Sequence, residues 1–484
     1  MKTTFAFFLM IILLLPTFAQ QPEKTFTVNT DKQYQTIEGF GTSLINFGSY
    51  WKEFPELYRT PEFQEFYVNE MGMNVLRCNL WGGVLMNPVE NWQDIRFQDF
   101  DLTVSQVKKP NNRRDMQVFV DFAKAMIEIE PNAKIIGTVW TPPPWMKMNN
   151  ELTGAGTGAI HGDRYINRKT KEPVKNRLKP EYFKHYAKYL TEWVKLFEHH
   201  TGKPLYGISI GNEVMFTQSF GSCVWTAEDY GKMVVVLGQM LESEGYDEVL
   251  IYGPETMTSH NHADANPMYV EVLTEGPAAK YLDVFATHGY VDGFEEEYGA
   301  EALIEFRKMI KDTGKSLWIT EGGTGGHQWP QPLTGIAAAV YNAAVYGNVS
   351  AFTPWQVTDP HANTHGMMIF DMPTPKTYTA QHFFSFIDAG AVRVDASPAK
   401  NAVNIAAFLH PEKNDLTVVL INPTGTENSV AIQLEGQAAQ MTQAKAFRTS
   451  QTERMNPVQI RNGEKNIETT LPPYSIVTVK GKVE

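Results

Sequence analysis

Short apolar runs rich in β-branched residues alternate with longer amphipathic segments from about residue 35 to residue 357. Within several of the longer segments, such as 182–199 and 301–312, apolar residues recur at helical spacing. Strands that alternate with helices in this way are typical of a parallel sheet, and eight of them predict a (β/α)8 TIM barrel. The predicted strands are 36–41, 74–80, 134–140, 206–213, 248–255, 283–290, 316–322 and 349–357.

The pattern changes after Asp371. Residues 401–480 contain alternating runs, such as 403–409 and 416–421, which are separated by Pro, Gly and Asn turns. This pattern predicts an antiparallel β-sandwich. The segment 24–33 also alternates and is expected to join that domain, so the sandwich is built from both termini. The predicted α/β chain therefore divides into a signal peptide (1–19), N-terminal strands of the sandwich (20–34), a catalytic barrel (35–385) and the C-terminal sandwich (386–484).

The first 19 residues have the pattern of an export signal. Lys2 precedes the apolar stretch 5–15, which is followed by Pro16 and by Thr-Phe-Ala at 17–19. This order is typical of a cleavable signal peptide, and the apolar stretch is too short to span a bilayer. We expect cleavage after Ala19 and a secreted or periplasmic protein; an uncleaved anchor is the alternative.

Composition narrows the range of partners. The net charge is −12, and aromatic residues make up 12% of the chain, including 10 Trp. An acidic chain argues against nucleic acid and other polyanions as partners. Aromatic rings suit stacking on sugar faces, although core packing also uses them. We expect a monomer with no membrane span. Cys78 and Cys223 form an even pair that permits a disulfide, and two buried thiols fit equally well.

Polar and aromatic residues mark the ends of the predicted strands. In a (β/α)8 barrel the active site forms at the carboxyl ends of the strands. The residues that we expect to bind a substrate there are Arg77, Trp81, Trp140, Asn212, His288, Tyr290 and Trp355.

Three glutamates compete for a catalytic role at these ends. Two carboxylates delivered by separate strands are the minimum needed to cleave a glycosidic bond, since one protonates the leaving oxygen and the other attacks or stabilises the sugar carbon. Asn212 beside Glu213 could hold a sugar hydroxyl while the acid reaches the glycosidic oxygen. Glu321 precedes two glycines that leave space for a sugar ring. We therefore predict Glu213 and Glu321 as catalytic residues, and Glu255 as a supporting or subsite residue.

Six segments of the chain together resemble glycoside hydrolase family 30. They are GFGTS at 39–43, LRCNL at 76–80, WTPPPWMK at 140–147, SIGNEV at 209–214, WITEGG at 318–323 and HFFSFIDAGAVRVDAS at 382–397. The resemblance implies a (β/α)8 barrel with a side β-structure, retention of the anomeric configuration, an acid/base glutamate after strand four and a nucleophile after strand seven. Those positions are Glu213 and Glu321.

Two departures bear on the substrate. The acid motif is GNEV, where the family more often has QNEP, and the loop 355–366 has no arginine where members that recognise glucuronate usually have one. The expected function is a secreted retaining β-glycoside hydrolase, endo-acting on a neutral polysaccharide such as β-glucan or xylan. The family also contains enzymes for β-1,6-glucan, β-galactan and glucosylceramide. The alternatives are an exo-acting β-glycosidase and a catalytically weak carbohydrate-binding barrel.

Two His-rich loops raise the question of a metal. The segments 259–267 and 359–366 are polar loops with two histidines each, and neither is expected to bring two histidines and a carboxylate together on one face of a helix. Polar loops that border a substrate cleft are the better interpretation. We expect neither a metal nor a cofactor.

Overall fold

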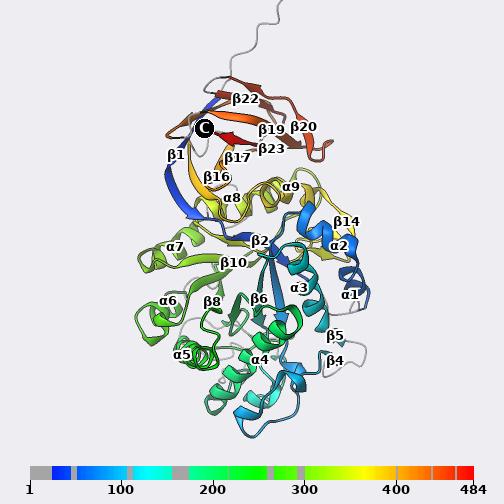
Figure 1. The fold of residues 1–484 in the computed structure, drawn as a ribbon, viewed down its shortest axis with the longest axis vertical. Helices are drawn as coiled ribbons and strands as arrows, with labels where there is room; N and C mark the ends of the chain where they lie inside the picture. The colour runs from blue at the N-terminus through cyan, green and yellow to red at the C-terminus, as the bar shows by residue number, and fades with distance from the viewer. Residues whose placement is uncertain are drawn as a thin grey trace, which may run out of the picture.

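The computed structural model describes residues 24–484 apart from 45–51, 106–112, 155–173, 216, 259–265, 291–299, 399–401, 438–439 and 464–465. The expected signal peptide lies outside the described residues, as does most of the His-rich segment 259–267. The chain forms a barrel surrounded by helices and a β-domain that packs against it (Figure 1). Among the described residues, no helix is both long and apolar enough to cross a membrane.

Eight parallel strands close into the predicted barrel, in the order β10-β11-β2-β3-β6-β7-β8-β9. They are β2 (Gly39–Ser43), β3 (Val75–Leu80), β6 (Lys134–Val139), β7 (Gly207–Ser209), β8 (Leu250–Met257), β9 (Val284–Gly289), β10 (Ser316–Gly322) and β11 (Ala351–Phe352). Each corresponds to one predicted strand. The first begins at Gly39 rather than at residue 36, because residues 24–36 form β1 of the other domain.

Helices follow the strands and cover the outside of the barrel (Figure 1). Their ends obey local rules: the Thr226 hydroxyl accepts a hydrogen bond from the Asp229 N–H at the start of α5, and Gly202 ends α4 in the left-handed region at φ +77°. The helices are α1 (Glu53–Tyr58), α2 (Pro61–Glu65), α3 (Gln117–Ile129), α4 (Phe183–Thr201), α5 (Ala227–Glu244), α6 (Asn266–Thr274), α7 (Glu301–Ile310), α8 (Ala338–Val345) and α9 (Pro375–Phe384).

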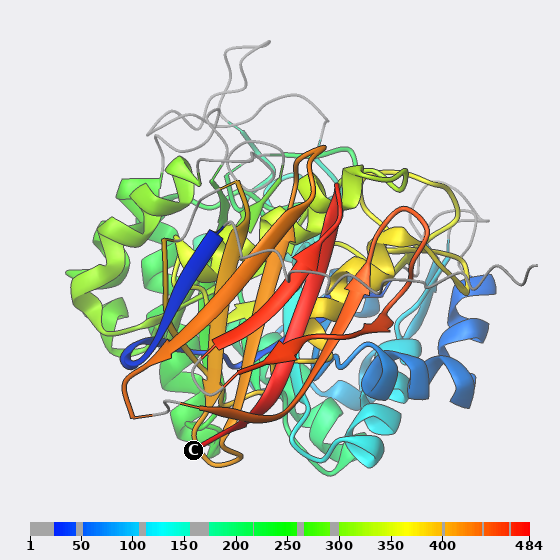
Figure 2. The same ribbon diagram turned by 90° about the horizontal axis from the view of Figure 1, so that it is seen from above.

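The β-domain contains strands from both ends of the chain, as predicted. The blue β1 lies among the orange C-terminal strands in Figure 2. The strand order is β20-β19-β23-β17-β16-β15-β1-β18-β22-β21. One detail differs from the antiparallel prediction: β1 pairs antiparallel with β15 but parallel with β18, because the N-terminal strand inserts between two strands of opposite direction. The bounds are β1 (Lys24–Thr36), β15 (Val392–Ser397), β16 (Asn404–His410), β17 (Asp415–Asn422), β18 (Asn428–Glu435), β19 (Met441–Thr449), β20 (Asn456–Val458), β21 (Arg461–Asn462), β22 (Asn466–Leu471) and β23 (Ser475–Val483).

Strand β17 shows how the β-domain joins the barrel. Its alternate residues Val418 and Leu420 belong to the core of the sandwich, whereas Val419 and Ile421 belong to the apolar cluster of the barrel. A strand that is buried on both faces links two cores into one body. In α9, the buried His382 adds hydrogen bonds to the hydroxyls of Thr478 and Thr449, at 2.8 and 2.9 Å. The β-domain is therefore packed against the barrel rather than tethered to it.

The remaining strands are short, and both cysteines are free. The hairpin β4 (Thr103–Ser105) and β5 (Arg113–Asp115) belongs to the loop after β3, and β12 (Thr358–Asp359), β13 (Met368–Ile369) and β14 (Met372–Pro373) follow β11. Cys78 in β3 and Cys223 after β7 are buried free thiols, so they do not form the disulfide that the sequence also allowed.

Candidate active site

Polar side chains from four strands of the barrel, β3, β7, β9 and β10, meet at the carboxyl ends of those strands. Arg77 lies in β3, His288 in β9 and Glu321 in β10. Glu213 and Asn212 lie in the loop just beyond the three-residue strand β7, so the predicted strand 206–213 is shorter than expected. Glu213 has φ +47°, a region that few non-glycine residues occupy and that functional sites often contain.

Arg77 is the centre of this cluster. Its side chain is fully buried and donates hydrogen bonds to Glu321 Oε2 (2.7 Å), Asn212 Oδ1 (2.7 Å) and Glu255 Oε1 (3.1 Å). Charge-assisted hydrogen bonds of this kind fix geometry and stabilise the negative charge of a carboxylate. Arg77 therefore holds the carboxylate of Glu321 in place and orients the Asn212 side chain, rather than offering its own guanidinium to a substrate.

His288 lies between the three glutamates. Its Nδ1 is 3.3 Å from Glu213 Oε1 and 3.8 Å from Glu321 Oε2, and its Nε2 is 3.6 Å from Glu255 Oε1. Burial alone would lower the pKa of His288, but the surrounding carboxylates raise it to about 9. The imidazole is therefore a cation near neutral pH, and it is fully buried. The sequence predicted a substrate-binding residue here, whereas the structure places a buried charge that faces the carboxylates.

Glu213 and Glu321 have different surroundings. One oxygen of each lies within 4.8 Å of the other, which is close to the separation of about 5–5.5 Å in retaining glycosidases and well below the roughly 6.5–9.5 Å of inverting ones. Glu321 accepts hydrogen bonds on both oxygens, from Arg77 and from the Tyr290 hydroxyl. Burial raises the pKa of Glu213, although His288 partly opposes it. Of the two carboxyl groups, Glu213 is therefore the one that burial shifts towards the protonated form.

The charges of the cluster balance in that state. Arg77 and His288 carry two positive charges, and Glu255 and Glu321 carry two negative charges when Glu213 holds its proton. Burial alone would raise the pKa of Glu255, but Arg77 and His288 lower it to about 2. An unbalanced buried charge is costly, so electroneutrality favours one acid and one carboxylate facing each other.

Two indoles form an aromatic wall beside this pair. The rings of Trp140 and Trp355 are 5.7 Å apart and tilted by 38°, and the guanidinium of Arg77 lies 4.7 Å from the ring centre of Trp140. Trp140 is buried and Trp355 is half-buried. Trp355 therefore has the ring surface that a sugar could cover.

Trp81, which was also expected to bind substrate, and two further tryptophans that follow barrel strands are covered by other parts of the chain. Trp81 is 1% exposed, and a Cβ on Gly221 would lie 2.0 Å from its ring, so the chain passes directly over the indole. Trp225 is equally buried and packs on Tyr186, and the indole N–H of Trp329 binds the carbonyl of Tyr474 in the β-domain. The prediction that Trp81 binds substrate therefore finds no exposed ring face in the structure.

Sequence reasoning did not identify two buried lysines that fix the loops around the site. Lys376 in α9 donates to Thr324 Oγ1 and Gly325 O after β10 and to Asn363 O after β11. Lys147 donates to Thr141 Oγ1 and Ser222 O, which joins the loops after β6 and β7. In the sequence, each lysine is indistinguishable from a surface residue, so no local signal could reveal these roles.

Glu213, His288 and Glu321 are also spaced so that they could hold a metal ion. The chemistry of the group argues against this use. A metal-ligating histidine must be neutral, whereas these carboxylates favour the imidazolium. The Arg77 guanidinium, 2.7 Å from Glu321, already supplies the positive charge that a metal would bring. The arrangement suits proton transfer and nucleophilic attack by carboxylates.

The charge of His288 should be visible in the pH dependence of the site. Because the imidazolium lowers the pKa of Glu213, the variant His288→Gln is expected to raise that pKa and to move the basic limb of the kcat/KM profile to higher pH. Turnover should also fall several-fold, because the side chain that separates the carboxyl groups of Glu213 and Glu321 is replaced. The control is His410→Gln in the β-domain. A basic limb at the native position would contradict the assigned contact between His288 and Glu213.

Known proteins show the same fold and related sequences. A family model described as the glycosyl hydrolase family 30 TIM-barrel domain matches residues 37–330, which is more than half of the chain, and a model of the family 30 beta sandwich domain matches residues 390–479. The solved structure of Xyn30A, a glycoside hydrolase family 30 subfamily 8 xylanase from Clostridium acetobutylicum, superimposes with a TM-score of 0.70 at 22% identity, over 95% of this chain and 99% of that one.

Curated relatives differ in the activities for which they are named. Putative glucosylceramidase 1 from Caenorhabditis elegans is 24% identical over 448 residues, or 84% of this chain and 78% of that protein. Glucuronoxylanase XynC from Bacillus subtilis (strain 168) is 24% identical over 407 residues, or 83% of this chain and 78% of that protein. Two activities at the same identity leave the substrate to be inferred from the residues of the site.

Proposed function

The chain belongs to glycoside hydrolase family 30 and is therefore a retaining glycoside hydrolase, and we propose that it is exported and cleaves internal bonds of a neutral β-linked polysaccharide, with Glu321 as nucleophile and Glu213 as acid/base. One observation carries the assignment of roles: the carboxyl groups of Glu213 and Glu321 face each other within 4.8 Å in a charge-balanced cluster, and of these two Arg77 binds Glu321.

The reaction proceeds in two displacements. A Glu321 oxygen attacks the anomeric carbon, the bond from that carbon to the leaving oxygen breaks, and Glu213 gives its proton to the leaving oxygen. The charge on Glu321 helps to keep the pKa of Glu213 high, so this pKa falls once Glu321 is esterified. Glu213 then takes a proton from water, and the water oxygen displaces the ester. Two inversions leave the product with the starting configuration.

The residues beside the pair favour a neutral sugar. The segment 358–366 contains neither Arg nor Lys, although bidentate arginine is the usual partner of a uronate. Arg77 is fully buried and donates to Glu321, Glu255 and Asn212, so it presents no exposed guanidinium to a uronate, and the acidic chain repels polyanions at long range. Trp355 supplies an apolar ring, and Asn212 supplies an amide whose N–H groups have no acceptor among the described residues. β-Glucan and neutral xylan both fit this description.

Export and endo action complete the proposal. The first 19 residues support export, and the N-terminal sequence of the exported protein should start at Gln20 if the signal is cleaved as expected. The relative that is named glucuronoxylanase supports action on a polysaccharide chain. Exo action, as in a glucosylceramidase-like or β-xylosidase-like enzyme, is the alternative outcome.

A substrate panel tests the proposal directly. The chain is incubated with neutral arabinoxylan, glucuronoxylan, β-1,3-glucan, β-1,6-glucan, β-galactan and glucosylceramide, and product lengths are followed over time. Early oligosaccharides of mixed length from a neutral polymer are expected. Monosaccharide as the first product would establish exo action. A requirement for glucuronate branches, or a steep loss of cleavage between roughly 50 and 500 mM salt, would reveal an ionic anchor and contradict the neutral-substrate proposal.

Trp355 should contribute to binding on every accepted substrate. The variant Trp355→Ala is expected to raise KM about 10-fold, because loss of an aromatic contact with its buried area costs on the order of 1.5 kcal/mol and 1.4 kcal/mol is a factor of ten. Trp92→Ala, a change in the half-buried loop that contacts α4, is the matched control. An unchanged KM and kcat for Trp355→Ala would remove this residue from the site.

A further inference from the structure

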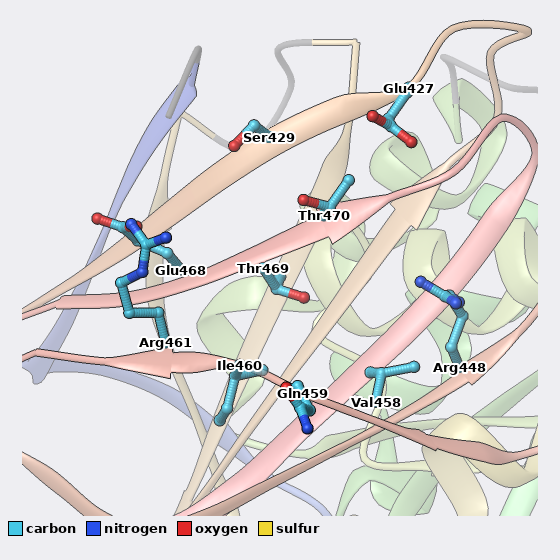
Figure 3. Close-up of a pocket in the computed structure, with 10 residues that line it drawn as sticks. All are labelled: Glu427, Ser429, Arg448, Val458, Gln459, Ile460, Arg461, Glu468, Thr469 and Thr470. Atoms are coloured by element: carbon cyan, nitrogen blue, oxygen red, sulfur yellow. The ribbon is translucent and has the colours of Figure 1, made fainter. Parts of the chain in front are cut away.

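The β-domain has a cavity of its own. It has a volume of about 690 Å³ and lies where the two edge strands of the sheet, β20 and β21, are joined by Gln459 and Ile460 (Figure 3). Its walls come from β18, β19 and β22 as well as from this connection. The lining residues are Glu427, Ser429, Arg448, Val458, Gln459, Ile460, Arg461, Glu468, Thr469 and Thr470, and we call this space the sandwich groove.

Four hydrogen-bonding side chains that line the sandwich groove have no partner among the described residues. The hydroxyls of Ser429, Thr469 and Thr470 and the amide of Gln459 make no hydrogen bond with any other described residue, although each lines the cavity. Thr469 is only 6% exposed. Most buried polar side chains in folded proteins are paired, so an unpaired hydroxyl that faces a cavity is available to solvent or a ligand.

The arginines around the groove are already paired with carboxylates. The Arg448 guanidinium binds both oxygens of Glu453, at 2.7 and 2.6 Å, and Arg461 binds Glu468 at 2.9 Å. Because both arginines are paired, no lining residue offers an unpaired cation, and Glu427 adds a negative charge. Both features disfavour a phosphate or a uronate as the ligand. Apolar contact comes from Val458 and Ile460. The matching ligand is neutral, rich in hydroxyl groups and partly apolar.

We propose that the sandwich groove is a second binding site, for a segment of neutral glycan, separate from the cleft of the barrel. Sugar hydroxyls would pair with Ser429, Thr469 and Gln459, and C–H faces would lie on Val458 and Ile460. The volume is within the roughly 300–1,000 Å³ of typical ligand sites and suits a short oligosaccharide. Occupation of both sites by one polymer would raise the effective concentration of substrate at the barrel.

Affinity electrophoresis of the full chain tests this site. The variant Glu321→Gln, which should not cleave, is run in native gels that contain neutral arabinoxylan, β-1,3-glucan, β-1,6-glucan or β-galactan. The choice of β-linked polymers as probes rests on the proposed function of the barrel. The assignment of the groove to a neutral glycan rests only on the residues that line it. At least one polymer is expected to retard Glu321→Gln, and retardation should persist after Trp140→Ala and Trp355→Ala are added to weaken the barrel cleft.

Groove variants in the same background give the decisive comparison. The triple variant Thr469→Val, Thr470→Val and Gln459→Ala should bind about 10-fold more weakly. Gln459→Ala alone should bind a few-fold more weakly, and because Gln459 is exposed this single change leaves the core of the domain intact. Thr442→Val, in β19 but outside the groove, is the matched control. The same groove changes are also made in a chain that keeps Glu321. The rate at which these variants hydrolyse an aryl glycoside should stay within two-fold of the native rate.

Three results would overturn the proposal: equal retardation of the groove variants and the control, loss of all retardation on weakening the barrel cleft, or no retardation by any polymer. Hydrolysis of the same polymers by the native chain is measured separately. Retardation without hydrolysis would support the groove while refuting the function proposed for the barrel.

Discussion

Replacing Glu321 with glutamine is expected to lower kcat on every accepted substrate by about 10⁵-fold or more, because loss of a catalytic nucleophile has effects on that scale. Glutamine has the shape of glutamate, and its oxygen can still accept the hydrogen bond from Arg77. KM and the thermal unfolding midpoint should therefore change little. Rates are measured on the best polymer of the panel and on an aryl glycoside, since both require the nucleophile.

Two further measurements separate this role from a structural one. Glu38→Gln is the matched control, because Glu38 is also bonded inside the protein, to Trp318 Nε1 and Ser350 Oγ, but precedes β2 at the opposite end of the barrel. Incubation of the native chain with a slow 2-fluoro glycoside should add one sugar to a peptide that contains residues 316–322. A label on another peptide, or substantial turnover by Glu321→Gln, would assign the nucleophile elsewhere.

The barrel could be predicted because its signals are local. Each strand is a short β-branched run that ends in glycine or loop, and closure of the barrel brings all the strand ends together. Arg77, His288 and Glu321 could therefore be grouped without knowledge of any contact. The sequence could not provide the direction and the charge of each side chain. His288 was expected to bind substrate, and it is the three surrounding carboxylates, seen only in the structure, that identify its imidazole as a buried cation.

The tryptophans illustrate why the walls of the site were harder to predict. An indole that follows a strand can point into the cleft or under a loop, and the covering residue is often distant in sequence. Trp81 is covered by Gly221, 140 positions later in the chain, and Trp329 is held by Tyr474 of the other domain. Trp140 and Trp355 meet only because β6 and β11 belong to the same closed barrel. Such contacts depend on tertiary structure and leave no periodic signal.

Glu213→Ala should give a different pattern from Glu321→Gln. On polysaccharides, whose leaving groups are poor, loss of the acid is expected to lower kcat/KM by about 10²–10⁴-fold. On aryl glycosides with activated leaving groups the first step needs no proton, so the glycosyl-enzyme still forms and its hydrolysis becomes slow. The dependence of kcat/KM on the leaving-group pKa should therefore be steep in the variant and shallow in the native chain.

The pH profile and external azide complete this test. Native kcat/KM requires protonated Glu213, so activity falls as pH rises through its pKa, which burial raises above the ordinary value for glutamate. Glu213→Ala should lose that basic limb on an activated aryl glycoside. Azide, a small anion that needs no general base, should enter the space left by the carboxylate, accelerate breakdown of the intermediate and yield the β-glycosyl azide. Azide that neither accelerates turnover nor appears in the product would mean that Glu213 is not the acid/base. The adjacent Glu255 could then be tested by the same leaving-group series, although its burial and its pKa of about 2 make it a poor proton donor.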